Sequence, residues 1–108
     1  MKLLSRAEET LLLAVWRLQQ EAYGVKIREQ IERVTGQSWA FGALFVTLER
    51  LVKKEMLISY LTDPTPERGG RSKRVYKLTI DGREALIQIK KVENELWEGI
   101  DNLSLEKR

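Results

Sequence analysis

A short basic segment, residues 68–77, holds the side chains with the clearest chemical use. It contains no acidic residue, and its five cations are Arg68, Arg71, Lys73, Arg74 and Lys77. Two glycines, Gly69 and Gly70, lie among them and allow the backbone to approach another surface closely. Basic side chains bind nucleic-acid phosphates and release condensed counterions, which supplies most sequence-independent affinity. The segment therefore predicts contact with DNA; the alternative is a solvated hairpin whose charges prevent aggregation through an exposed edge.

The rest of the composition excludes most catalytic and metal chemistry. The 108-residue chain has 19 basic and 16 acidic residues, a net charge of +3, and neither cysteine nor histidine. Disulfides, thiolate nucleophiles, imidazole bases and nearly all zinc or haem sites are thereby excluded. The pair Gly69-Gly70 is not followed by the Lys-Ser/Thr of a nucleotide-binding loop. We predict no enzyme activity, no cofactor and no metal site.

The distribution of apolar residues gives no sign of a membrane segment. The longest uninterrupted apolar run, Leu11–Trp16, is far shorter than the ~18–20 residues that cross a bilayer. The N-terminal residues do not resemble a signal peptide, because Glu8 and Glu9 precede that run. We therefore expect no membrane partner and a cytoplasmic location.

Local signals predict three helices, a hairpin and a final helix. Ser5 and Glu8 form an S-x-x-E capping box, which starts the first helix, and residues 19–21 end it. A second helix is predicted over about 23–35, before Gly36, and a third from about 39–40 to 54. Strands are predicted over 58–62 and around 75–78, with a Pro/Gly-rich loop between them. Thr79 begins a last helix that continues to about Leu103.

Helical spacing predicts which side chains face the core. The predicted inward or core positions include Ala7, Trp16, Val34 and Phe41. Trp39 is predicted to pack at the start of the third helix. The opposite, outward face of that helix carries Gly42, Ala43, Val46, Glu49, Arg50 and Lys53.

The predicted order of elements is that of a winged helix-turn-helix, a mainly α fold with a small β-hairpin. Three parts of the chain are similar to PadR-like transcriptional regulators. Ala22–Arg28 resembles the second helix of that family, Phe41–Leu51 its recognition helix, and Pro64–Arg71 with Arg74–Gly82 its wing. The resemblance covers roughly residues 5–105. It implies a winged-helix DNA-binding domain over residues 1–79, followed by a C-terminal dimerisation helix over residues 80–108.

The resemblance and the charge pattern together single out residues for contact with double-stranded DNA. They are Tyr23, Lys26, Gly42, Ala43, Val46, Thr47, Arg50, Lys53, Arg68, Gly69, Gly70, Arg71, Lys73 and Arg74. The small apolar residues of the third helix can touch thymine methyls but cannot hydrogen-bond base edges, and Glu49 beside them would repel phosphates. The alternatives are that this face is plain solvent-exposed helix, that Tyr23 is half-buried, and that Lys26 is merely solvated.

The last helix predicts a homodimer. Five apolar residues recur along it at spacings of 3, 4, 4 and 3, close to a coiled-coil seam: Ile89, Val92, Leu96, Ile100 and Leu103. From Ile80 to Leu103 such a helix has 24 residues and is ~36 Å long, more than the domain beneath it can cover. Its distal half, with Trp97, is predicted to pack against a second copy; the alternative is packing onto the first helix of the same chain.

The family resemblance implies a dimeric, DNA-binding transcriptional regulator. By analogy it would be a repressor that binds a palindromic operator and is released by a small aromatic or hydrophobic effector. In some short PadR-like regulators an aromatic residue of the last helix lines such an effector pocket, and Trp97 is similarly placed. The alternative role of Trp97 is packing within the dimer interface. The alternative function is a winged-helix protein-interaction module without DNA binding, which the few polar groups on Gly42, Ala43 and Val46 favour.

Overall fold

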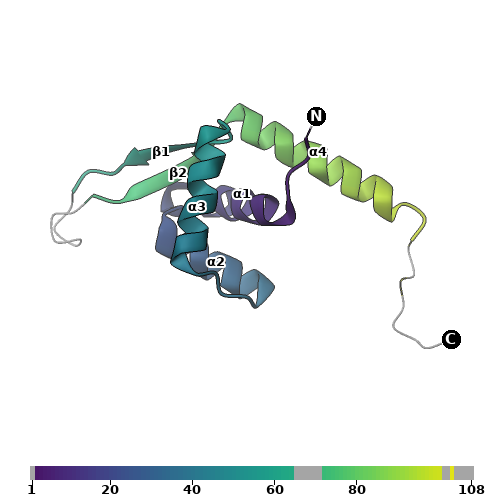
Figure 1. Cartoon of the computed structure of the whole chain (residues 1–108), viewed down its shortest axis with the longest axis horizontal. Helices are drawn as coiled ribbons and strands as arrows, with labels where there is room; N and C mark the ends of the chain where they lie inside the picture. Colours follow the sequence, from purple (N-terminus) through teal and green to yellow (C-terminus); the bar gives the residue numbers. More distant parts are fainter. Residues whose placement is uncertain (1, 65–71, 101–102, 104–108) are drawn as a thin grey trace.

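The computed structural model describes residues 2–64, 72–100 and 103. Within them, three helices precede a two-stranded antiparallel hairpin and a fourth helix. The elements are α1 (Arg6–Leu18), the 3-10 turn η1 (Gln19–Glu21), α2 (Gly24–Thr35), α3 (Phe41–Lys53), β1 (Leu57–Leu61), β2 (Arg74–Leu78) and α4 (Ile80–Trp97). The hairpin and the far half of α4 extend from opposite sides of the body formed by α1, α2 and α3 (Figure 1). This is the predicted winged-helix order.

The predicted local signals start and end the helices. The Ser5 hydroxyl accepts a hydrogen bond from the Glu8 backbone N–H, and the Glu8 carboxylate accepts one from the Ser5 N–H, which completes the capping box of α1. Gly36, with φ of 75°, ends α2 in the left-handed conformation that glycine adopts without strain. The Thr79 hydroxyl caps α4 by accepting from the Gly82 N–H at 3.0 Å.

The core lies where α1, α2 and α3 meet the hairpin. Its fully buried side chains come from every one of these elements: Leu11, Leu12, Val15, Ile27, Ile31, Leu44, Leu48, Leu51, Leu57, Val75 and Tyr76. Trp39 packs partly against this core, as predicted.

Four predicted inward positions are wrong. Ala7 is exposed because the neighbouring Glu8 and Glu9 occupy the buried side of the first turn of α1. Val34 and Phe41 are exposed because they lie at the last turn of α2 and the first residue of α3, beyond the elements that cover the core. Trp16 is also exposed, and the Arg83 guanidinium of α4 lies 4.8 Å from its ring centroid.

The hairpin is joined to the start of α2. Its strands pair from Leu57 opposite Leu78 to Leu61 opposite Arg74, within one residue of the predicted limits of the first strand. An isolated bridge links Tyr23 with Val75, and the Tyr76 N–H donates to the Ala22 carbonyl at 2.9 Å. These bonds hold the first half of β2 beside the N-terminus of α2.

The last helix is shorter than predicted. Helix α4 has 18 residues and ends at Trp97, so Ile100 and Leu103 lie beyond it rather than on a continuous stripe. The local sequence explains the end: the last turn holds no basic residue to complement the helix dipole, and Gly99 takes a φ of 80°. None of the described helices is long and apolar enough to span a membrane.

A carboxylate pair connects α4 to α1. Arg6 of α1 lies 3.2 Å from Glu9 and 3.6 Å from Glu93 of α4. Burial raises the pKa of Glu9, and the hydrogen bond and repulsion between Glu9 and Glu93 raise it further, while Arg6 acts in the opposite direction. This cluster links the C-terminal half of α4 to the first turn of α1.

Candidate nucleic-acid interface

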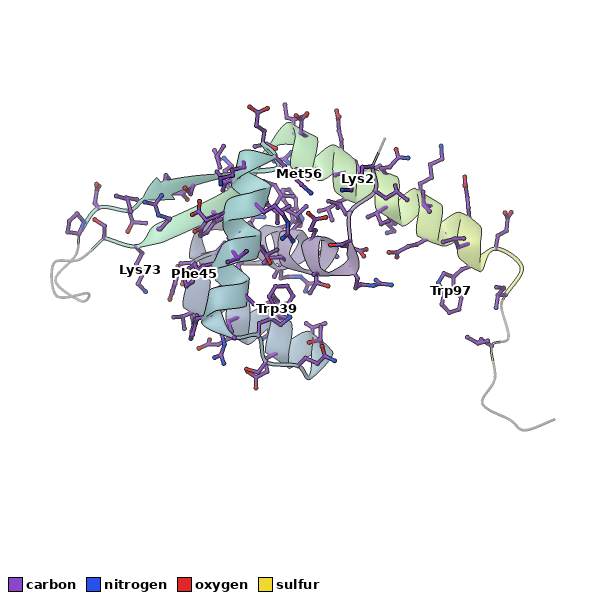
Figure 2. All side chains as sticks on the ribbon, viewed as in Figure 1. Lys2, Trp39, Phe45, Met56, Lys73 and Trp97 are labelled. Atoms are coloured by element: carbon purple, nitrogen blue, oxygen red, sulfur yellow. The ribbon has the colours of Figure 1, made fainter. Side chains whose placement is uncertain are left out.

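A groove lies where the start of α2, the exposed side of α3 and the start of the returning strand β2 meet. Its volume is about 690 Å³, and its lining residues are Tyr23, Gly24, Val25, Phe45, Glu49, Lys73, Arg74 and Tyr76. Figure 2 labels Phe45 on α3 and Lys73 next to β2, on the side of the molecule that carries this groove. Of the residues predicted to contact DNA, Tyr23, Lys73 and Arg74 line this groove, whereas the residues predicted on α3 do not.

Three of the five cations of the basic segment are described, and two of them, Lys73 and Arg74, border the groove. The Lys73 ammonium lies 3.7 Å from the centroid of the Tyr23 ring, a cation–π contact that holds its charge at the edge of the groove. The Arg74 guanidinium is exposed and donates one hydrogen bond to the Ser59 hydroxyl at 3.0 Å. Arg68, Gly69, Gly70 and Arg71, predicted to contact DNA, lie outside the described residues.

Most of the predicted residues on α3 are at the surface. Gly42, Ala43, Val46, Arg50 and Lys53 are exposed. Arg50 is also tied to the body, since its Nε lies 3.5 Å from a carboxylate oxygen of the buried Glu8. Tyr23, which precedes α2 as its N-cap residue, and Lys26 on α2 are half-buried.

Thr47 does not belong to this surface. It is only 7% exposed, and its hydroxyl donates to the Ala43 carbonyl at 2.9 Å, one turn earlier in the helix. The hydroxyl is therefore used inside α3 and faces the core side, so the prediction that Thr47 contacts DNA is not carried further.

The sequence interpretation missed an aromatic pair beside the groove. The rings of Phe41 and Phe45 stack with centroids 6.2 Å apart, and the Arg28 guanidinium lies 4.6 Å from the Phe41 centroid. The Phe45 ring also lies directly over Gly24, where an added Cβ would be 2.8 Å from Cζ of the ring. The spacing of four residues between the two phenylalanines was the available signal, because it puts both on one side of a helix.

The fold agrees with a family match along most of the chain. Residues 12–88 match the model of the transcriptional regulator PadR-like family. The chain belongs to the PadR-like family. It is therefore a DNA-binding transcriptional regulator rather than an enzyme.

Solved structures of other PadR-like proteins have the same architecture. A PadR family transcription regulator from Clostridium difficile R20291 is 26% identical, with a TM-score of 0.61 over 85% of this chain and 92% of that one. A PadR-like transcription factor from Bacteroides fragilis is 24% identical, with a TM-score of 0.71 over 91% and 89%. A PadR-like regulator from Bacillus cereus is 19% identical, with a TM-score of 0.70 over 94% and 93%. Among curated proteins, no sequence matches this chain.

The residues predicted for dimerisation of this PadR-like regulator fall into two groups. Ile89 and Val92 are half-buried, and Ile89 packs partly against the core of its own chain. Leu96, Trp97, Ile100 and Leu103 are exposed. Figure 2 shows Trp97 at the far end of α4, away from the body. The binding of an effector at Trp97 stays a prediction. It is tested by adding planar hydrophobic compounds and measuring tryptophan fluorescence. Compounds that bind there should quench the part of the emission that comes from Trp97, which is the part missing in a Trp97→Phe variant.

Proposed function

We propose that this PadR-like regulator is a dimeric repressor that places α3 in the major groove and the basic wing on the adjacent phosphates. The observation that carries this proposal is the position of Lys73 and Arg74, which border the groove beside the exposed side of α3. Phosphate contacts by the wing would supply affinity and orientation, and α3 would supply base contacts. We also propose that the protein is located in the cytoplasm, where it has access to the DNA.

Removing the two wing cations that line the groove, Lys73 and Arg74, tests the proposal. The double variant Lys73→Ala/Arg74→Ala is expected to bind duplex DNA at least about tenfold more weakly at low salt, because two phosphate contacts are lost. The slope of log affinity against log salt concentration should become shallower by about 2. The measurement is a fluorescence-anisotropy titration at several salt concentrations, with a duplex selected by the native protein from a randomised pool.

The matched control removes the same charge elsewhere. Lys90 and Lys91 are exposed on α4 and do not line the groove, so Lys90→Ala/Lys91→Ala should retain the native salt slope. Equal slopes for the wing variant and the native protein would contradict the placement of the wing on DNA. Failure of the native protein to bind any duplex in a salt-dependent manner would favour the protein-interaction module instead.

The exposed end of α4 supports the dimer. Leu96 is 70% exposed and Trp97 is exposed beside it, although both are large and apolar. A second copy would cover them, and a two-fold dimer would present two α3 helices to successive half-sites of a palindrome. Repression would follow where the dimer covers a promoter; higher transcription of neighbouring genes after deletion of the protein would support repression over activation.

A charge placed at Leu96 should weaken this dimer. Burying a leucine stabilises by about 1.5–3 kcal/mol, so Leu96→Glu is expected to raise the dimer dissociation constant at least about tenfold. Sedimentation equilibrium over a concentration series measures this. Val34→Glu on α2 is the control, because Val34 is also 70% exposed and should leave the dissociation constant unchanged. A native protein that sediments as a monomer throughout would overturn the dimer.

A further inference from the structure

The exposed side of α3 is unusually apolar for a helix that meets DNA. Phe41 and Phe45 are both over 40% exposed, and Val46 is 64% exposed. Val25, at the start of α2, is exposed next to Phe45 in the same groove. We name these four residues the apolar patch. Such a patch on the surface of a small domain indicates a surface with a partner.

Contacts on two sides fix the position of the Phe45 ring in the apolar patch. Phe45 is held on one side by Gly24, which leaves no room for a Cβ between the α2 backbone and the ring. It is held on a second side by the stacked ring of Phe41, which in turn contacts the Arg28 guanidinium. Phe45 therefore offers its free edge to a partner without having to become ordered on binding.

The first two turns of α3 expose no side chain that can donate a hydrogen bond. Gly42, Ala43, Phe45 and Val46 have no polar side-chain atom, and the Thr47 hydroxyl is turned into the helix. Glu49 can only accept while ionised. These two turns therefore lack the arginine, lysine, asparagine or glutamine that recognises guanine or adenine by hydrogen bonds to the base edge; the cations of α3, Arg50 and Lys53, lie in its last turn.

The charges around the patch favour DNA, rather than a protein with an apolar surface, as the partner of the patch. Lys73 and Arg74 border it on the hairpin side, and Lys53 follows it on α3 together with Arg50, which is paired with the buried Glu8. Glu49 is the one acid among the described residues that line these two hollows. A cationic rim fits a polyanion, and the thymine C5-methyl is the apolar group that bases expose in the major groove.

We infer that the apolar patch contacts thymine methyl groups, so that thymines at adjacent positions of each half-site determine where this regulator binds. The inference rests on the proposed function and names the chemical group that α3 recognises. Phe45 and Val46 are the residues that make the contact. The wing cations supply affinity for any sequence.

Replacing thymine by deoxyuridine tests the inference, because it removes only the methyl group and retains base pairing. The probe is the duplex selected by the native protein from a randomised pool, with each thymine replaced in turn. Replacement at one or two adjacent positions per half-site is expected to weaken binding about three- to tenfold. With Val46→Ala or Phe45→Ala, the difference between thymine and deoxyuridine at one of those positions should vanish.

A matched control shows whether the lost difference is specific to the apolar patch; an effect of deoxyuridine on DNA shape alone would persist in the Val46→Ala and Phe45→Ala variants. Val34→Ala shortens an exposed valine on the far end of α2 and should retain the full difference between thymine and deoxyuridine. Circular dichroism confirms that each variant is folded. Salt-dependent binding with no sensitivity to deoxyuridine would overturn the inference and leave the proposed function standing. No binding to any duplex would overturn both and favour a protein partner for the patch.

Discussion

The Gly82→Ala variant is expected to be less stable than the native protein by about 2–4 kcal/mol in free energy of unfolding. Gly82 is buried in the first turn of α4. An added Cβ would lie 2.3 Å from the carbonyl oxygen of Met56 and 3.2 Å from its carbonyl carbon. These are backbone atoms, so the methyl group can be accommodated only if α4 moves away from the turn that precedes β1.

That movement would break the hydrogen bonds that attach α4 to the body. The Thr79 N–H donates to the same Met56 carbonyl at 3.1 Å, and the Thr79 hydroxyl donates to the Glu55 carbonyl at 2.6 Å. Urea unfolding at fixed protein concentration measures the loss. A Gly82→Ala variant as stable as the native protein would show that the start of α4 is free to shift.

Gly42→Ala is the matched control, because it makes the same change on the exposed side of α3. A Cβ at Gly42 would meet nothing within 4 Å. Alanine there should stabilise the protein by about 0.4–1 kcal/mol, since it reduces the entropy of the unfolded chain and favours the helix. The two substitutions are thus expected to change stability in opposite directions.

The second large effect concerns Glu8, a buried carboxylate that joins α1 to α3. Lys54 donates a hydrogen bond to one of its oxygens at 2.8 Å, and Arg50 lies 3.5 Å from the same oxygen. The Ser5 N–H donates to the other oxygen at 2.9 Å. Burial alone would raise the pKa of Glu8, but the hydrogen bonds and the charge of Lys54 outweigh burial and lower the pKa from 4.5 to about 2.

Glu8→Gln is expected to destabilise the folded protein by about 2–3 kcal/mol at neutral pH. Because the folded-state pKa lies below 4.5, the ionised carboxylate stabilises the fold above about pH 4.5. This stabilisation disappears as the pH falls towards 2. The difference between the variant and the native protein should therefore narrow steadily on acidification, as measured by urea unfolding between pH 2.5 and 7.

Two further variants check the assignment. Glu29→Gln removes an exposed carboxylate from α2 and should change stability by less than about 0.5 kcal/mol at any of these pH values. Lys54→Met removes the closest cation, which helps to lower the pKa of Glu8. In this variant the acid-induced loss of free energy of unfolding should therefore begin at a higher pH than in the native protein. A Glu8→Gln difference that stays constant from pH 7 to 2.5 would contradict the role of the charge.

The amino-acid sequence by itself determined the local features of this PadR-like regulator. Ser5 with Glu8, Gly36 and Thr79 act on backbone groups a few residues away, so their capping roles followed from type and spacing. The order of helices and hairpin, and with it the winged-helix fold, followed from the same short-range signals. The family was predictable from residues 22–82, which carry the resemblance in order.

The tertiary structure alone decided which residues are covered and what they touch. Helical spacing shows which side chains share a face, but it does not show where the neighbouring element ends; this is why Trp16 and Val34 proved exposed and Thr47 proved buried. The Phe45 ring packs on Gly24, and Gly82 packs against Met56, so both contacts join segments that are distant in sequence. Such close approaches depend on how whole elements pack, because short-range preferences constrain only neighbouring residues.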